Sequence, residues 1–510
     1  MRRSAAALPL AFLLLAASCT DDGPTAVSSG STTTVTGGGA GEATTTAAGG
    51  GLPTPTIEWT EFGQDSGVET GSIIVPVDYA DPSAGTFDLF IARHKAPEST
   101  RIGSLLVNPG GPGFGGSDFA IYADQIYSRA LLDHFDIVGW DPRGTGLSEP
   151  AIDCIDDYDH FFAGTDITPD DDAERQQLID LAEEFAGDCE TKNADILPYV
   201  TTNNSARDMD MIRQALGEAK ISYFGFSYGS ELGATWATLF PATVRAAVLD
   251  GAADPNASFL ESGLQQSEGF EGTLATFLAQ CSADTSCAFN NNGNAEGAFD
   301  ALMLAIDNQP IPTYPDRPAL TRSMALTGVA QAMYSESYWP QLERSLSDAQ
   351  YGDGAGLLDL YDSYYQRRAD GTYDNSLEAF QSIVCMDDPE RLTVAQEDAS
   401  AAEFQAVAPR FSPGTTGSYF CTFFPPSIDP RVAITGAGAG PILVMGTTGD
   451  PATPLSSTEA MAAALEDGRL VVVTADQHTG YGVNQCSYDV VDNYLIDPAA
   501  NAPADGTRCE

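Results

Sequence analysis

The segment Gly225-Phe-Ser227-Tyr-Gly229 constrains the fold more than any other part of this chain. It follows the apolar run Ile221–Phe226, and a helix-like segment, Glu231–Phe240, comes after it. A glycine on each side of the serine is needed where a strand turns sharply into a helix, because a Cβ there would collide with neighbouring backbone. Such a turn raises the serine hydroxyl above the end of a sheet. The pattern therefore predicts an α/β fold with Ser227 as a nucleophile.

A serine nucleophile needs a base, and the base needs an acid that orients it. Of the four histidines, only His478 follows Ser227 on a loop after an apolar strand, Leu470–Val473. Asp450 directly follows another strand of this kind. The chain order serine, aspartate, histidine is that of α/β-hydrolases. We expect these three residues to form a catalytic triad, with Asp476 as the second candidate for the acid.

A glycine cluster, Asn108–Gly116, follows the strand-like run Leu105–Val107. Glycines let backbone N–H groups approach a substrate closely enough to stabilise a tetrahedral oxyanion. In this kind of fold one donor comes from this loop and the other from the residue after the nucleophile. We expect Gly111 and Tyr228 to be these donors, with Gly110 as the alternative to Gly111. No Lys-Ser or Lys-Thr pair follows the glycines, which disfavours a phosphate site.

A third motif, Trp140–Ser148, also follows a strand-like run and contains Asp141 and Arg143. Two opposite charges in one turn are expected to form a structural ion pair near the site. Neither residue is expected to be catalytic.

The first nineteen residues are typical of an export signal. Arg2 and Arg3 give the positive end, Leu8–Ala17 the apolar core, and Cys19 follows small residues as in bacterial lipoproteins. We expect Cys19 to be lipidated and the protein to be held on the outside of the cell membrane by this anchor only. Ordinary secretion as a soluble protein is the alternative. Residues 20–56, rich in Gly, Ser and Thr, are expected to form a flexible linker.

Eight further cysteines fit an oxidising compartment, where an even number suggests disulfide bonds. Pairing by proximity along the chain gives Cys154–Cys189, Cys281–Cys287, Cys385–Cys421 and Cys486–Cys509. Zinc is the rival interpretation, but no C-x-x-C spacing or histidine partner supports it. We expect no metal ion and no cofactor.

The formal net charge is −49, from 23 basic and 72 acidic residues. So acidic a surface argues against binding to nucleic acids or to anionic membranes. It favours cationic substrates, such as peptides with a free N-terminal amine.

The apolar pattern divides the mature chain into three parts. Strand–helix alternation runs from Ile57 to Leu249, with helices expected at residues 117–131 and 208–218. From about Asn256 the pattern is helical and rich in tyrosine, and alternation resumes at Ile442. We predict a mostly parallel central sheet flanked by helices, with a helical lid inserted after its sixth strand. The core would comprise residues 57–255 and 428–510, and the lid residues 256–427.

These motifs resemble those of the secreted tripeptidyl aminopeptidases of actinobacteria, which are α/β-hydrolases of the proline iminopeptidase family. The resemblance runs from about Ile57 to Cys509 and is carried by Asn108–Gly113, Asp141–Ser148, Gly225–Gly229, Tyr338–Pro340, Gly352–Gly354, Cys385–Asp387, Asp450–Pro454 and Gly506–Cys509. It implies that residues 428–510 are the C-terminal part found in these aminopeptidases. It also implies an enzyme that removes short peptides from free N-termini, with Ser227 as nucleophile, His478 as base and Asp450 as its orienter.

One departure from the family concerns the histidine loop: Gln477 and Thr479 flank His478, where relatives often have glycine. Relatives also hold the substrate amine with lid carboxylates. The candidates here are Glu261, Glu268, Glu271 and Glu336.

Two other functions compete with an exopeptidase. An esterase or lipase would use the same triad on an oxygen leaving group. A catalytically silent binding lipoprotein would be expected to have a broken triad or oxyanion loop, and neither is seen. Dehalogenases and epoxide hydrolases are disfavoured because they use an aspartate where Ser227 stands.

Overall fold

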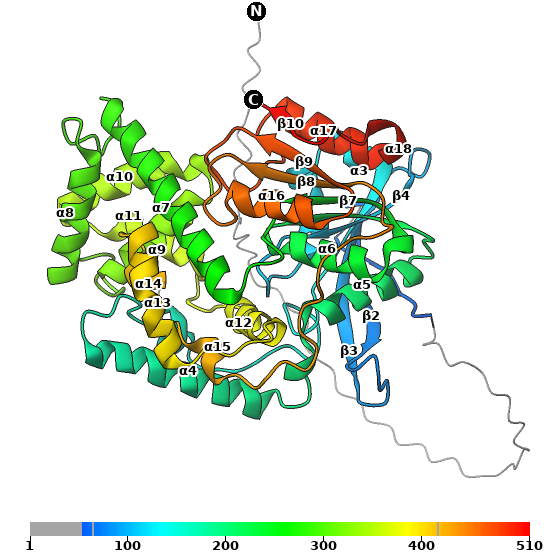
Figure 1. Ribbon diagram of the computed structural model, residues 1–510, viewed down its shortest axis with the longest axis horizontal. Helices are drawn as coiled ribbons and strands as arrows, with labels where there is room; N and C mark the ends of the chain where they lie inside the picture. The colour runs from blue at the N-terminus through cyan, green and yellow to red at the C-terminus, as the bar shows by residue number, and fades with distance from the viewer. Residues whose placement is uncertain (1–53, 64–65, 416–417) are drawn as a thin grey trace, which may run out of the picture.

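A ten-stranded sheet forms the centre of the protein, with the strand order β1-β2-β3-β5-β4-β6-β7-β8-β9-β10 (Figure 1). The computed structural model describes residues 54–63, 66–415 and 418–510. β1, β2, β3 and β5 pair antiparallel, and every pair from β5 to β10 is parallel. The predicted signal segment with Cys19, and the predicted linker as far as residue 53, lie outside the described residues.

The strands fall close to the apolar runs of the sequence, since burial on both faces demands apolar side chains throughout. Every residue of β4, β5, β6 and β8 is buried. The strands are β1 (Thr60–Glu61), β2 (Val68–Pro76), β3 (Thr86–His94), β4 (Gly103–Asn108), β5 (Phe135–Trp140), β6 (Ile221–Phe226), β7 (Val244–Asp250), β8 (Ile442–Thr447), β9 (Gly468–Val473) and β10 (Thr507–Cys509).

Helices cover both faces of the sheet, so that it has an apolar core on each side. One face carries α5 (Thr202–Ala215), α6 (Tyr228–Leu239) and α16 (Leu455–Ala464). The other carries α1 (Ser117–Ile121), α2 (Ala123–Ile126), α3 (Arg129–His134) and α17 (Gln485–Ile496), with α18 (Pro498–Asn501) next to α17.

The single helix expected at residues 117–131 is wrong: three short helices stand there. α1 ends at Ile121, and the backbone of Tyr127 is extended after α2. Ser128 then caps α3 by accepting a hydrogen bond from Leu131 N at 3.2 Å. A serine that caps a helix interrupts the one before it, because its own backbone is extended.

The helical lid lies between β7, the seventh strand along the chain when β1 is counted, and β8. In Figure 1 its helices α7 to α11 gather on one side of the sheet, where they enclose an apolar core of their own. The lid helices are α7 (Phe259–Ala283), α8 (Ala295–Asn308), α9 (Arg322–Met333), α10 (Trp339–Gln350), α11 (Ala355–Tyr364), α12 (Ser376–Asp387), α13 (Val394–Val407), α14 (Ser412–Thr415) and α15 (Phe420–Phe423).

A long helix that was not expected from the sequence, α4 (Asp172–Lys192), joins the lid from an earlier part of the chain. Its residues Ile179 and Ala182 pack with Tyr419, next to α15. Asp171 caps it by accepting hydrogen bonds from two backbone N–H groups. The lid is therefore built from two segments, one before and one after the nucleophile in the sequence.

The four disulfides join the pairs expected from chain order: Cys154–Cys189, Cys281–Cys287, Cys385–Cys421 and Cys486–Cys509. The first joins the segment after β5 to α4, which contains Cys189, and the third joins two lid helices, with Cys385 in α12 and Cys421 in α15. The second lies at the end of α7 and the fourth links α17 to β10.

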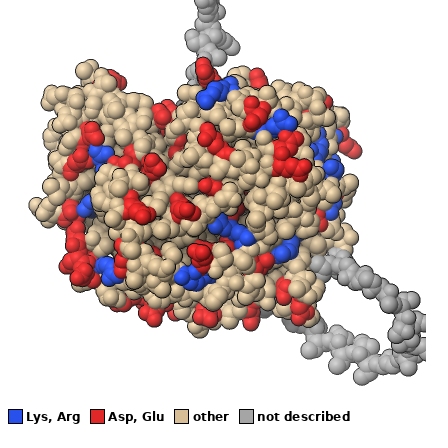
Figure 2. Space-filling view, in the orientation of Figure 1, with Lys and Arg blue, Asp and Glu red and all other residues tan. Residues whose placement is uncertain are grey.

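Acidic side chains are spread over the face of the molecule shown in Figure 2, both over the sheet part and over the lid. Basic side chains on this face are fewer and mostly lie beside acidic ones. Within the described ranges, no helix has the length and apolar character needed to cross a membrane. The same residues contain no group of His, Cys, Asp and Glu side chains that could hold a metal ion.

Candidate active site

Ser227 stands at the sharp turn between β6 and α6. Its φ of 55° and ψ of −126° are unusual for a residue with a side chain, and such backbone costs about 1–3 kcal/mol. The turn is tight enough to exclude side chains at its flanks: a Cβ on Gly225 would lie 2.3 Å from the carbonyl oxygen of Gly229. A Cβ on Gly229 would lie 2.9 Å from Asn108 Oδ1. The two glycines therefore serve the steric role that the sequence predicts.

His478 and Asp450 lie in direct contact on the loops that follow β9 and β8. The Nδ1 atom of the ring is 2.8 Å from Asp450 Oδ1 and 2.9 Å from Oδ2. The aspartate also accepts hydrogen bonds from the N–H groups of Ala452, Thr453 and Thr479. The side chain of Asp450 is fully buried and that of His478 is 10% exposed. The carboxylate thus holds the ring with its proton on Nδ1 and leaves Nε2 without a proton.

The pKa of His478 reflects two opposing effects. Burial lowers this pKa, but the charge of Asp450, its hydrogen bond to the ring and the charge of Asp250 together outweigh burial and raise the pKa above the ordinary value. Nε2 is buried and has no hydrogen-bond partner among the described residues, the Ser227 hydroxyl included. In serine hydrolases the hydrogen bond between the base and the nucleophile is often long until substrate binds.

The backbone of Asp250 and Gly251 brings the serine and the histidine together. Ser227 N donates to Asp250 O at 2.8 Å. A Cβ on Gly251 would lie 2.9 Å from His478 Cε1. The histidine ring therefore lies directly beside the residues that hold the nucleophile turn.

The glycine loop after β4 reaches the same place. A Cβ on Gly110 would lie 2.8 Å from Ser227 Cβ and 3.3 Å from Tyr228 N. The Gly110 amide donates to Asn108 Oδ1 at 2.9 Å and is thus engaged. The amides of Gly111 and Tyr228 donate no hydrogen bond to any atom in the described part of the chain.

The expected ion pair between Asp141 and Arg143 is wrong. The carboxylate of Asp141 accepts hydrogen bonds from Ser117 N at 3.0 Å and Leu147 N at 2.9 Å. Arg143 instead pairs with Asp208, at 2.6 Å between Nη2 and Oδ1, and both side chains are fully buried. Asp141 therefore holds loop backbone next to the site, whereas Arg143 joins its own loop to α5.

Asp476, the second candidate for the acid, does not contact His478. Its N–H donates to Glu336 Oε1 at 2.8 Å, and its side chain accepts from Gln280 Nε2 at 3.5 Å. Burial and the nearby charge of Glu336 raise the pKa of Asp476. The lid residue Glu336 thus binds the loop that carries His478 through its carboxylate.

A second lid contact reaches the histidine itself. The backbone carbonyl oxygen of Tyr334, at the end of α9, accepts a 3.0 Å hydrogen bond from His478 N. The rings of Tyr334 and His478 meet edge to face, with their centroids 5.7 Å apart. The sequence predicts only a helical region rich in tyrosine here. A single tyrosine that contacts a loop elsewhere in the chain has no signal in the sequence.

The other lid carboxylates are engaged elsewhere or exposed. Glu261 closes the capping box of α7 with Ser258. Glu271 forms an ion pair with Arg410 at 2.7 Å. Glu268 is exposed on α7; Glu336 is exposed as well, but it accepts a hydrogen bond from the histidine loop. Of the four candidates, only Glu336 is bound to the histidine loop.

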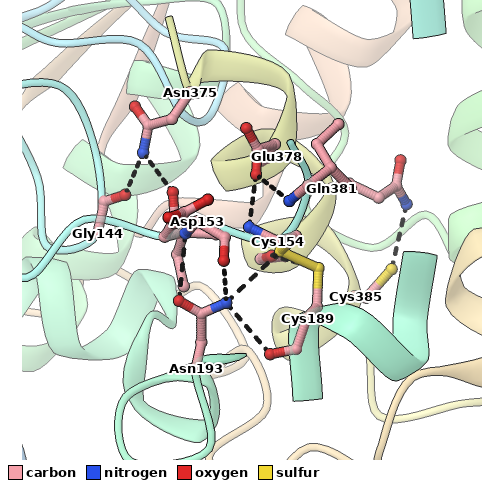
Figure 3. The surroundings of a disulfide bond; sticks show 12 residues. Gly144, Asp153, Cys154, Cys189, Asn193, Asn375, Glu378, Gln381 and Cys385 are labelled. Atoms are coloured by element: carbon pink, nitrogen blue, oxygen red, sulfur yellow. Dashed lines mark hydrogen bonds between the residues drawn. A yellow bond between two sulfur atoms is a disulfide. The ribbon is translucent and has the colours of Figure 1, made fainter. Parts of the chain in front are cut away.

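Helix α12 joins the lid to the core close to the Cys154–Cys189 disulfide (Figure 3). Asn375 Nδ2 donates to Gly144 O at 3.0 Å and to Ile152 O at 2.9 Å, and its Oδ1 accepts from Gly146 N at 3.2 Å. Glu378 accepts from Cys154 N at 2.6 Å. These bonds lie beside the Cys154–Cys189 disulfide and fix the first turn of the helix.

The first turn of α12 also lies against the glycine loop. A Cβ on Gly113 would lie 2.3 Å from Ser376 O and 2.4 Å from Phe380 N. The lid and the loop that holds Gly111 are therefore in direct backbone contact.

Comparisons with known proteins agree with this geometry. The family model described as "alpha/beta hydrolase fold" matches residues 103–485. The chain belongs to the α/β-hydrolase fold family. The serine protease Hip1 of Mycobacterium tuberculosis is 35% identical to this α/β-hydrolase over 483 residues, covering 89% of this chain and 91% of the relative.

Two further relatives have names of different kinds. Carboxylesterase B of Mycobacterium tuberculosis is 35% identical over 449 residues, covering 86% of this chain and 85% of the relative. The tripeptidyl aminopeptidase of Streptomyces coelicolor is 29% identical over 467 residues, covering 88% and 85%. The family and the named relatives agree in one respect: this α/β-hydrolase is a serine hydrolase.

Proposed function

We propose that this α/β-hydrolase is a serine exopeptidase that removes di- or tripeptides from free N-termini through an acyl-enzyme. The observation that carries the proposal is the Asp450–His478 pair, held beside a strained Ser227 turn. Relatives named serine protease and tripeptidyl aminopeptidase support a peptide substrate.

The proposed mechanism uses the triad and two backbone amides. His478 Nε2 takes the Ser227 proton as the hydroxyl oxygen attacks the scissile carbonyl carbon. The free amides of Gly111 and Tyr228 donate to the oxyanion, while the engaged Gly110 amide does not. The imidazolium, stabilised by Asp450, then gives its proton to the leaving amine. Water then attacks the acyl-enzyme while His478 takes its proton, and the proton passes to Ser227 as the peptide acid is released.

Glu336 is the lid carboxylate that we assign to the free amine of the substrate. Glu336 accepts a hydrogen bond from the histidine loop, whereas Glu261 and Glu271 bind other residues of the lid. A second negative charge, Asp476, lies next to it. The acidic net charge favours a cationic ligand at this place.

A carboxylesterase is the second candidate function, favoured by the relative of that name at 35% identity. A substrate panel separates the two. Residues 20–510 and the Ser227→Ala variant are assayed on Ala-Ala-Pro amides of a fluorogenic amine, with a free or acetylated N-terminus, and on a short-chain ester. We expect cleavage of the free-amine peptide only. Ester turnover without amide turnover would move the assignment to an esterase.

We also propose that the protein is exported and anchored outside the cell membrane through a lipid on Cys19. The four disulfides support an oxidising compartment. Metabolic labelling with a palmitate analogue tests the proposal: we expect incorporation that Cys19→Ser abolishes. A fully soluble, unlabelled protein in the culture medium would favour ordinary secretion.

A further inference from the structure

Asp250, the last residue of β7, is bound to two of the loops that form the site. Its carbonyl oxygen accepts from Ser227 N at 2.8 Å. Its carboxylate accepts from Gly480 N at 2.7 Å and Tyr481 N at 2.8 Å, in the loop that carries His478. One residue therefore holds the backbone of both the nucleophile turn and the base loop.

The next residue extends this connection to the third loop. Gly251 N donates to Met445 O at 2.9 Å, in the strand that leads to Asp450. Gly251 has a φ of +66°, and a Cβ on it would lie 2.9 Å from His478 Cε1 and 3.3 Å from Nδ1. The His478 ring thus fills the space that a side chain at position 251 would need.

The charge of Asp250 faces the triad and little else. The side chain is fully buried, and the charged groups that face it are His478 and Asp450. Burial raises the pKa of Asp250 to about 6, against the lowering effect of its two backbone hydrogen bonds and of His478. A group that served only to satisfy two N–H groups would not need a buried charge, which is costly to desolvate.

We propose that Asp250 is a positioning residue of this active site, which fixes His478 relative to Ser227 and favours the imidazolium formed during acyl transfer. Displacements of about 1 Å are enough to cost about a hundredfold in rate at such sites. A negative charge in a water-poor interior acts more strongly on a nearby imidazolium than it would in water. The inference rests on the triad of the proposed function, but not on a peptide substrate.

The test is the rate at which a fluorophosphonate labels Ser227, measured across pH in the full mature chain. Asp250→Asn is compared with Asp492→Asn, a matched control: Asp492 is also a buried aspartate bound to Tyr481, but through the phenol, at 2.9 Å. We expect Asp250→Asn to lower the plateau rate by at least about tenfold. Its acidic limb should move to lower pH, because loss of the negative charge lowers the pKa of His478. Asp492→Asn should change neither.

An Asp250→Asn rate no lower than that of the control, with an unmoved acidic limb, would overturn the proposal. Wild-type protein that is not labelled at Ser227 would instead refute the triad itself. If Asp250→Asn does not fold, Gly251→Ala is measured in its place. This change keeps the carboxylates of Asp250 and Asp450, and its added methyl group displaces the His478 ring. We then expect a slower rate with the limb at its wild-type pH, and an unchanged rate would overturn the proposal.

Discussion

The Asp450–His478 contact decides which ring nitrogen can act as the base. Both carboxylate oxygens lie within 2.9 Å of Nδ1, so the proton of the neutral ring is held there and Nε2 is left free. The same carboxylate accepts three backbone hydrogen bonds, which hold it in place. Asp450 thus both orients the His478 ring and places a carboxylate beside it.

Asp450→Asn should therefore remove most of the activity and leave the fold intact. An amide oxygen can still accept backbone hydrogen bonds, but it cannot stabilise the imidazolium as a carboxylate does. We expect kcat to fall by about 10⁴, with KM nearly unchanged. Steady-state kinetics on the best substrate of the panel, together with a circular-dichroism spectrum, checks this. A loss of less than tenfold would mean that another group orients His478.

Glu336→Gln tests the recognition of the substrate amine. The loss of one negative charge should raise KM for a free-amine peptide by about tenfold, which corresponds to about 1.4 kcal/mol. KM for the acetylated peptide or for an ester should not change. Glu343→Gln, in α10 two turns further along the lid, is the control. Equal effects of Glu336→Gln on charged and acetylated substrates would contradict the assignment.

Helix α12 links the stability of the lid to the geometry of the glycine loop. Its first residues pack on Gly113, and Asn375 just before it makes three hydrogen bonds to the loops of the core. Movement of this helix must move the glycine loop, because the two backbones are in contact without intervening side chains.

Asn375→Ala should accordingly lower activity as well as stability. We expect a loss of about 1–3 kcal/mol in the free energy of unfolding and a fall in kcat larger than any rise in KM. Asn294→Ala is a matched control, because Asn294 caps another lid helix, α8, by accepting from Gly297 N at 3.2 Å. It should cost about 1 kcal/mol and leave kcat unchanged. Equal kcat in the two variants would contradict a coupling through α12.

The elements that the sequence predicted well are those with a strong local signal. Apolar runs located the strands around the site, and the flanking glycines located the nucleophile turn, because steric exclusion there leaves no other residue possible. Chain order gave the correct disulfide pairs.

The elements and contacts that were missed depend on distant partners. α4 has many polar residues, and it joins the lid through contacts with α15 and an ion pair between Arg175 and Asp398 of α13, both far along the chain. Arg143 finds Asp208 across 65 residues, which chain proximity to Asp141 could not indicate. The contacts that Asp250 and Tyr334 make with the histidine loop likewise join parts of the chain that are distant in sequence.

At the scale of the whole molecule, the ionisation of buried carboxyl groups should shape stability. Burial raises the pKa of Asp250 and Asp492 to about 6, of Glu378 to about 7 and of Asp387 to about 8. These groups bind protons more tightly when folded than when unfolded. Their stabilising effect is present below the ordinary carboxyl pKa of about 4 and is lost as pH rises through 6 to 8.

We therefore expect Tm to be highest near pH 5 and to fall steadily toward pH 8. Carboxylates whose pKa is lowered, such as Asp398 bonded to Arg175, act in the opposite sense and lose their effect only at more acidic pH. The net charge of −49 adds repulsion that grows with pH and that salt screens. Calorimetry from pH 4 to 9, with and without 0.5 M salt (about a 4 Å Debye length), checks this. A Tm that rises toward pH 8 would contradict it.

Covalent labelling by a fluorophosphonate identifies the nucleophile directly. Trypsin releases the nucleophile turn on the peptide Ile221–Arg245, which also contains Ser222 and Ser230. Tandem mass spectrometry should place the label on Ser227 alone, and His478→Ala should slow labelling by about 10³ or more. A label on another serine, or equal labelling of Ser227→Ala, would contradict the proposal that Ser227 is the nucleophile.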